Sequence, residues 1–178
     1  MDEIHLVAYD PAWPLMYAAE AARVAAALPP GLVLAMEHFG STAIPGMLAK
    51  PVIDLLVAVR SVEEARETAV GSMEALGYAF WADNPRRDRL FFVKGLPPAA
   101  RQRTHHVHMT EMDGEMWRRL LFRDYLRTHP EEAQRYAALK QRLATRHRED
   151  REAYTAAKAR YVEEVMAKAS AGASNGRP

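Results

Sequence analysis

The sequence predicts an α+β domain: a sheet of about five strands, two helices among the early strands and a helical C-terminal part. Short apolar segments bounded by glycine, proline and polar residues recur between residues 33 and 110, which is typical of strands. From Glu115 onward the apolar residues recur every three or four positions, which is the helical period. With 178 residues, of which 49% are hydrophobic, the chain is long enough to bury one core.

The first third of the chain predicts one helix and two strands. We expect the helix to open at Asp10-Pro11 or Trp13-Pro14, because proline fits the first turn, and to stop at Pro29-Pro30-Gly31. The apolar segments at residues 33–39 and 51–59 predict the first two strands.

A second helix is expected after the second strand. Ser61 and Glu64 have the spacing of a capping box at its start, and Gly77 suits its C-terminal end. Period-two segments then predict three further strands, at residues 78–82, 89–94 and about 104–110.

The C-terminal part predicts three helical stretches, the second beginning at Pro130. The pattern leaves open whether the third is continuous with the second. Their apolar stripes are formed by Trp117, Leu120, Leu121 and Tyr125, then Tyr136, Leu139 and Leu143, then Tyr154, Ala157, Tyr161 and Val165. The predicted domain spans residues 1–169, and the small polar residues of 170–178 predict a disordered tail.

Composition excludes several classes of protein. The absence of cysteine removes disulfides, zinc–thiolate sites and thiol nucleophiles, and it fits a reducing compartment. No apolar run approaches the ~20 residues of a membrane helix, and the N-terminus lacks the features of a signal peptide, so we expect a cytoplasmic protein without a membrane partner. Basic residues gather in the second half, but acidic residues alternate with them, which favours solvated helix faces over a nucleic-acid footprint.

Asp54 is the charged residue within the apolar segment 51–59, and a carboxylate in a buried strand must be bound to something. In a strand over residues 104–110, His106 and His108 point to one face, about 7 Å apart. Asp54 is the natural carboxylate to face them.

The pair His106 and His108 with Asp54 forms a candidate metal site, and Glu37 is a second candidate carboxylate, with His38 on the opposite strand face. Two imidazoles and one carboxylate suit Mn²⁺, Zn²⁺ or Ni²⁺ better than Mg²⁺. The alternative is that the histidines are polar residues of an exposed strand face.

The turn after the first strand is a candidate anion site. Gly40, Ser41 and Thr42 offer backbone N–H groups and two hydroxyls, and Lys50 can add a point charge. The alternative is an ordinary turn that Pro45-Gly46 closes.

Several motifs, ordered along nearly the whole chain, resemble those of the GrpB family. They are YDPAWP at residues 9–14, EHFGSTAIPG at 37–46, KPVID at 50–54, HVH at 106–108, FRDYLRTHP at 122–130, YAALK at 136–140 and YTAAK at 154–158. GrpB proteins resemble the nucleotidyltransferase superfamily, which implies a mixed sheet with flanking helices. A similar domain is fused to dephospho-CoA kinase in some bacteria, where it has been considered a folding accessory.

The resemblance also implies a degenerate site. In that superfamily a Gly-Ser turn holds the nucleotide triphosphate, and an Asp-x-Asp or Asp-x-Glu pair with a third carboxylate binds Mg²⁺. Gly40-Ser41 matches the turn and Asp54 matches the first carboxylate, but position 56 is leucine and the later strand offers histidines. Losing two of three acids argues against standard two-metal nucleotidyl transfer.

Three hypotheses of function follow. The first is an enzyme in which Gly40, Ser41 and Lys50 hold phosphate, while Asp54, His106 and His108 bind a metal or act as acid and base. The second is a binding module for a nucleotide or another phosphorylated small molecule. The third is a folding-accessory or protein-interaction domain in which the motif residues are structural.

Arg123 has two interpretations. It shares a helix face with Arg127, four residues later, so the pair can clamp a phosphate over the pocket. Alternatively, Arg123 pairs with Glu37 or Asp54 and fastens the helical part to the sheet, which we slightly prefer.

Overall fold

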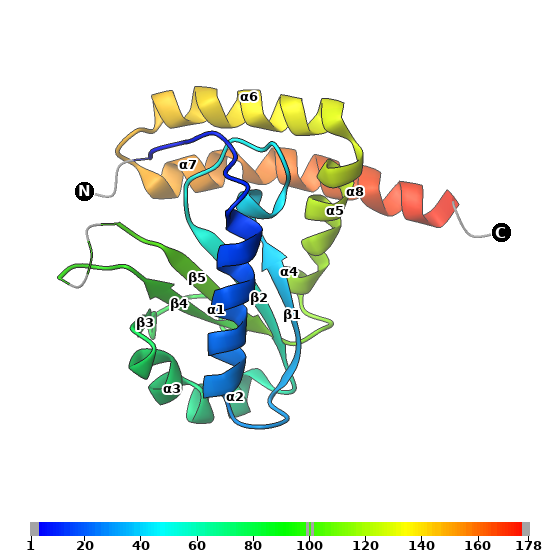
Figure 1. The fold of residues 1–178 in the computed structure, drawn as a ribbon. Helices are drawn as coiled ribbons and strands as arrows, with labels where there is room; N and C mark the ends of the chain where they lie inside the picture. The colour runs from blue at the N-terminus through cyan, green and yellow to red at the C-terminus, as the bar shows by residue number, and fades with distance from the viewer. Residues whose placement is uncertain (1–3, 99, 101, 176–178) are drawn as a thin grey trace.

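The computed structural model describes residues 4–98, 100 and 102–175, and it confirms the α+β fold with a five-stranded mixed sheet and flanking helices (Figure 1). In chain order the elements are α1 (Trp13–Ala27), β1 (Val33–Phe39), the 3₁₀ turn η1 (Ser41–Ala43), β2 (Ile53–Val59), α2 (Val62–Thr68), α3 (Val70–Ala75), β3 (Tyr78–Phe80), β4 (Arg89–Lys94), β5 (His105–Thr110), α4 (Glu115–Arg118), α5 (Leu120–Thr128), α6 (Pro130–Arg146), α7 (Arg151–Ala157) and α8 (Ala159–Asn175). No helix in the described residues combines the length and apolar character needed to cross a membrane.

The strand order is β1-β2-β5-β4-β3. β2 and β5 pair in parallel and the other neighbours are antiparallel, so the sheet is mixed, as the resemblance implied. β2 and β5 are far apart in the sequence and meet at the centre of the sheet. This central parallel pair places Asp54 beside His106.

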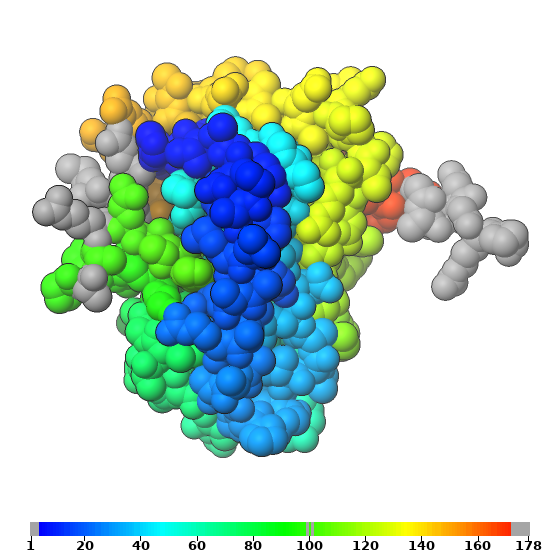
Figure 2. All heavy atoms as spheres, in the orientation of Figure 1, coloured from blue at the N-terminus to red at the C-terminus, as the bar shows by residue number. Residues whose placement is uncertain are grey.

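One face of the sheet carries the larger core. Alternate residues of β2, from Ile53 to Val59, pack with Val107 and Met109 of β5 against α1, α2 and α3. α1 runs across this face in the ribbon view, and its side chains cover the middle of the molecule in the space-filling view (Figures 1 and 2). The intervening residues, Asp54 and the histidines of β5, therefore point to the opposite face.

A second, smaller core joins the C-terminal helices to the segment after η1. Ile44 and Met47 pack there with Leu126 of α5, Tyr136 of α6 and Val165 of α8. α6 and α8 lie side by side at one end of the molecule (Figure 1) and are tied by Lys168 and Tyr161 of α8 to Glu132 of α6.

Two local predictions are confirmed at α2 and α3. The backbone N–H of Glu64 donates to Ser61 Oγ at 3.3 Å, as in a capping box, although the Glu64 carboxylate pairs with Arg60 instead of reaching back. Gly77 has φ +85°, the left-handed conformation that ends a helix.

The helical boundaries differ from our expectations at three places. The stretch after Glu115 is split into α4 and α5 at Arg119, and the one helix expected between Ser61 and Gly77 is split into α2 and α3 at Ala69. The second and third C-terminal stretches, whose continuity the pattern left open, are separate helices. α8 continues to Asn175, so residues 170–175 are helical in the structure, whereas we expected a disordered tail from residue 170. The rest of that tail, 176–178, lies outside the described residues.

Candidate functional site

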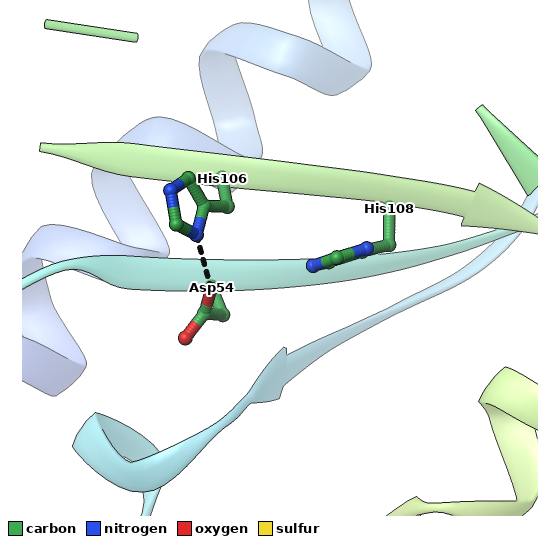
Figure 3. Close-up of side chains that lie close together, drawn as sticks. All are labelled: Asp54, His106 and His108. Atoms are coloured by element: carbon green, nitrogen blue, oxygen red, sulfur yellow. Dashed lines mark hydrogen bonds and ion pairs between the residues drawn. The ribbon is translucent and has the colours of Figure 1, made fainter. Parts of the chain in front are cut away.

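Asp54, His106 and His108 come together on the sheet face opposite the larger core (Figure 3). In the parallel register Asp54 lies beside His106, and His108 follows two residues later on the same face. One ligand atom of each side chain lies within 4.8 Å of the other two. His106 Nδ1 and Asp54 Oδ1 are 2.9 Å apart, a hydrogen-bond distance. The structure thus brings together the three side chains that the sequence pointed to.

Burial and charge set the protonation of this cluster. Burial alone would raise the pKa of Asp54, but the hydrogen bond from His106 and the neighbouring positive charges hold it below its usual value. Burial lowers the pKa of His108 to about 3, and the Asp54 carboxylate only partly opposes that effect. At neutral pH Asp54 is therefore ionised and His108 is a neutral imidazole, the forms that bind a cation.

Two ring nitrogens of the cluster are buried without a hydrogen-bond partner among the described residues. They are His106 Nε2 and His108 Nδ1. Buried polar atoms in proteins are nearly always paired, because an unpaired one keeps the full cost of its desolvation. Unpaired imidazole nitrogens beside a carboxylate are donor atoms of the kind that bind a cation.

Aromatic rings surround the histidines. The ring centroid of Phe91 lies 4.6 Å from that of His108 and 5.2 Å from that of His106, and Phe39 is 6.1 Å from His108. This apolar surrounding keeps water away from the imidazoles and strengthens electrostatic interactions at Asp54.

The turn between β1 and η1 presses directly on Asp54. Gly40 has φ +73°, and a Cβ built on it would lie 2.3 Å from Asp54 Oδ2. Only glycine fits such an approach. Ser41 follows in the cavity wall, which Tyr136 of α6 also lines. The predicted anion turn and the carboxylate therefore form one site.

Thr42 and His38 are occupied by contacts within the fold. Thr42 Oγ1 donates to the Val52 carbonyl at 3.3 Å and lies 3.0 Å from His38 Nε2. The His38 ring stacks on Tyr17 with centroids 4.8 Å apart, and burial lowers its pKa to about 4. Although Thr42 lines the cavity, its hydroxyl is directed to β1 and β2.

Arg123 pairs with Glu37 and fastens the helical part to the sheet, the second of its two interpretations. Its guanidinium donates to Glu37 Oε2 at 2.7 Å, to the His38 carbonyl at 2.8 Å and to Asp124 at 2.7 Å, so it fastens α5 to β1. Arg127 does the same for η1, donating twice to the Ala43 carbonyl. Glu37 is thereby engaged with Arg123 and is not part of the cluster around Asp54.

A cavity of about 640 Å³ opens over the Asp54 face, between the sheet and the C-terminal helices. Among the described residues its wall is strongly basic. The cations are Lys50, Arg86, Arg89, Arg118, Arg119, Arg123, Lys140 and Lys158, against the carboxylates Asp54, Glu115 and Glu163. Such an excess of positive charge concentrates anionic ligands near Asp54.

Sequence reasoning missed the lysines of the C-terminal helices as site residues. Lys140 and Lys158 each follow a tyrosine by four residues, in YAALK and YTAAK, which puts lysine and ring on one helix face. In the structure the ammonium groups lie 4.9 Å and 4.2 Å from the centroids of Tyr136 and Tyr154. The repeated spacing was a visible signal, but only the fold shows that both helices face Asp54.

Comparison with known proteins gives consistent results. The family model described as "GrpB protein" matches residues 3–168. A UPF0157 protein of Pseudomonas aeruginosa is 47% identical over 171 residues, which cover 96% of this chain and 69% of that protein. A crystal structure of the conserved protein GrpB from Enterococcus faecalis superposes with a TM-score of 0.82 at 33% identity, covering 93% of this chain and 96% of that one.

A part of a longer protein is also similar. A dephospho-CoA kinase of Mycolicibacterium paratuberculosis is 31% identical over 181 residues, which cover 87% of this chain and 43% of the kinase. The chain therefore spans less than half of that kinase, which matches the fusion noted for this type of domain.

Proposed function

The chain belongs to the GrpB family, and we propose that it binds a nucleotide or another phosphorylated small molecule in the basic cavity, together with a divalent metal held by Asp54, His106 and His108. The observation that carries this proposal is the position of the cluster. Asp54 and His106 lie in the wall of a cavity whose described residues carry a large excess of cations, and His108 lies beside them with its ligand atom within 4.8 Å of theirs. Each imidazole has an unpaired ring nitrogen. A cation site beside anion-binding groups is an arrangement that suits phosphate ligands.

The donor set fits a metal ion. One carboxylate and two imidazoles match the preferences of Mn²⁺, Ni²⁺ and Zn²⁺, whereas Mg²⁺ prefers oxygen ligands. Leu56, which replaces the expected second acid, leaves the site without the carboxylate pair of a two-metal centre. When bound, a single ion would polarise a phosphoryl oxygen and neutralise its charge.

The other groups have roles that follow from their positions. Gly40 and Ser41 offer backbone N–H groups beside Asp54, and Lys50 and the cavity arginines supply positive charge to phosphate oxygens. Phosphoryl or nucleotidyl transfer is the chemistry that such an arrangement would serve, because neutralising phosphate charge is its main requirement. The absence of cysteine supports a cytoplasmic place for this activity.

The metal part of the proposal is tested by calorimetric titration of Mn²⁺, Ni²⁺ and Zn²⁺. We expect Asp54→Asn and His108→Ala each to weaken binding at least about tenfold, since each removes one ligand. His105→Ala is the matched control, because His105 lies on the same strand outside the cluster. Unchanged metal affinity in both cluster variants, with folding intact, would overturn the metal site.

The phosphate part is tested by thermal unfolding against a panel of nucleotides and phosphorylated metabolites, with and without metal. A true ligand at 100 times its Kd stabilises the folded state by about 2.7 kcal/mol. We expect at least one compound to raise the Tm in the native chain and to do so less in Asp54→Asn. A panel without any shift at saturating concentration would overturn this part.

The likeness to part of a dephospho-CoA kinase favours a second candidate function, a non-catalytic domain that assists folding or contacts another protein. In that case Asp54→Asn would change stability without changing any ligand response. The same panel and variant therefore distinguish the two candidates.

A further inference from the structure

Three of the five lysines of the chain line the α6–α8 side of the cavity. Lys50 precedes β2, Lys140 lies on α6, and Lys158 stands at the junction of α7 and α8. They come from three segments up to 108 residues apart in sequence (158 − 50), so their convergence is a product of the fold.

The lysines share one aromatic wall. The Nζ atoms of Lys50 and Lys158 lie 5.4 Å and 4.2 Å from the ring centroid of Tyr154, and Tyr154 itself is buried. Lys140 is 1% exposed, lies over Tyr136 and donates to the Leu48 carbonyl. Besides its burial, the charges of Lys158 and Lys50 lower the pKa of Lys140, so the three ammonium groups lie near one another.

Within the described residues, two of these three lysines form no ion pair with a carboxylate. They are Lys140 and Lys158, whereas the buried Arg123 pairs with Glu37 and Asp124. Burial and mutual repulsion lower the pKa of Lys140 and of Lys158 to about 7. Gathering buried like charges is unfavourable, and an anion placed among them removes that cost.

The strand register separates these lysines from the opposite end of the cavity, where Arg89 lies and which we call the arginine end. Lys50 lies just before Ile53, where the parallel strands β2 and β5 both begin. Arg89 pairs with Thr110, where β5 ends, four residues beyond His106 and hence about 13 Å along the strand. The Asp54 cluster lies between the two ends, so the cavity offers cations on both sides of it.

We propose that Lys50, Lys140 and Lys158 form a second phosphate subsite, separate from the arginine end of the cavity. This inference rests on the proposed function, which it deepens: the cavity takes a ligand or ligand pair with phosphate groups on both sides of Asp54. The second phosphate belongs either to the far end of the same polyphosphate or to a second substrate. Both share the chemistry that three ammonium groups recognise.

The test is calorimetric binding of inorganic pyrophosphate to the full chain at pH 6, without metal and in the presence of a chelator. We expect Lys158→Gln to weaken binding at least about tenfold. Arg142→Gln removes the same charge from the exposed face of α6 and should leave the affinity unchanged. Lys158→Gln relieves repulsion, so its Tm should be equal to or above that of the native chain.

A second arm uses the pH dependence. Lys140 and Lys158 are charged below about pH 7 and lose their protons above it, so the subsite should weaken between pH 6 and pH 9. Lys158→Arg stays charged at both values and should lose less affinity over the same range. Comparing the two proteins cancels the titration of pyrophosphate itself.

The results separate this subsite from the proposed function. Asp54→Asn should keep metal-free pyrophosphate binding, because the lysines remain, even though it loses the metal. If pyrophosphate competes with a nucleoside triphosphate, the subsite holds the far end of the same polyphosphate. If both bind together, the subsite holds a phosphate of a second substrate. Either result supports the subsite. Equal pyrophosphate affinity of Lys158→Gln, Arg142→Gln and the native chain would overturn it, whatever the metal titrations give.

Discussion

At the scale of single residues, the closest approach in the site is that of Gly40 to Asp54. The turn has to be tight for Ser41 to reach the cavity wall, and a side chain at position 40 would occupy the place of the Asp54 carboxylate. Glycine at position 40 therefore allows the backbone conformation of the turn and also leaves space for the Asp54 carboxylate.

Gly40→Ala is expected to destabilise the protein more than Gly46→Ala. Both glycines have positive φ, but Gly40 also has ψ −170°, a conformation that is essentially restricted to glycine and costs another residue about 1–3 kcal/mol. Nothing lies within 4 Å of a Cβ at position 46. The clash at position 40 should add about 1–3 kcal/mol. Urea unfolding of the two variants measures the difference.

The double variant Gly40→Ala with Asp54→Ala removes the clashing carboxylate. It should recover part of the loss, so that the two substitutions are not additive. Additive losses would mean that the contact with Asp54 does not decide the cost.

At the scale of elements, α5 is the link between sheet and C-terminal helices. Arg123 reaches β1 through the Glu37 carboxylate and the His38 carbonyl, and Arg127 reaches η1 through the Ala43 carbonyl. These bonds fix the distance between α5 and the Asp54 face, and the cavity lies in the space so defined.

Arg123→Gln should lower the free energy of unfolding by about 2 kcal/mol, because it leaves the His38 carbonyl and Glu37 without their partner. Arg123→Lys should cost less, since it keeps the charge but loses the forked geometry. Arg119→Gln is the control: Arg119 pairs with the exposed Glu115 and its loss should stay within about 0.5 kcal/mol. Equal losses in Arg123→Gln and Arg119→Gln, measured by denaturant unfolding, would contradict this anchoring role.

At the scale of the whole molecule, the cavity lies between two cores of unequal size. The larger core fastens α1 to α3 onto one sheet face, and the smaller one holds α5, α6 and α8 together. The opposite sheet face is therefore left available for polar groups, which is where the Asp54 cluster lies.

Val165→Ala should loosen the C-terminal helices without opening the sheet. Val165 is fully buried in the smaller core, and shortening it costs about 1 kcal/mol or somewhat more. Hydrogen exchange should accelerate in α5, α6 and α8 and stay unchanged in β2 and β5. Uniform acceleration through the sheet would show that the two cores open together.

Much of the secondary structure could be predicted because its signals are local. The strands at 33–39, 89–94 and about 104–110, the helix at Pro130, the Ser61 cap and Gly77 depend on neighbours a few residues away. Alternation along a strand also placed His106 and His108 on one face. The ends of β2 and β3 and the break at Arg119 were not predictable, because packing decides them.

The sequence by itself determined the periodicity, the turn residues and the position of one carboxylate, Asp54, within an apolar strand, because each can be read from neighbouring residues. Only the tertiary structure decided which residues meet. Asp54 lies beside the histidines of β5, and Glu37 of β1 pairs with Arg123 instead. Three lysines that are far apart in the sequence line one cavity. Such choices depend on contacts between residues far apart in the chain, which no local pattern contains.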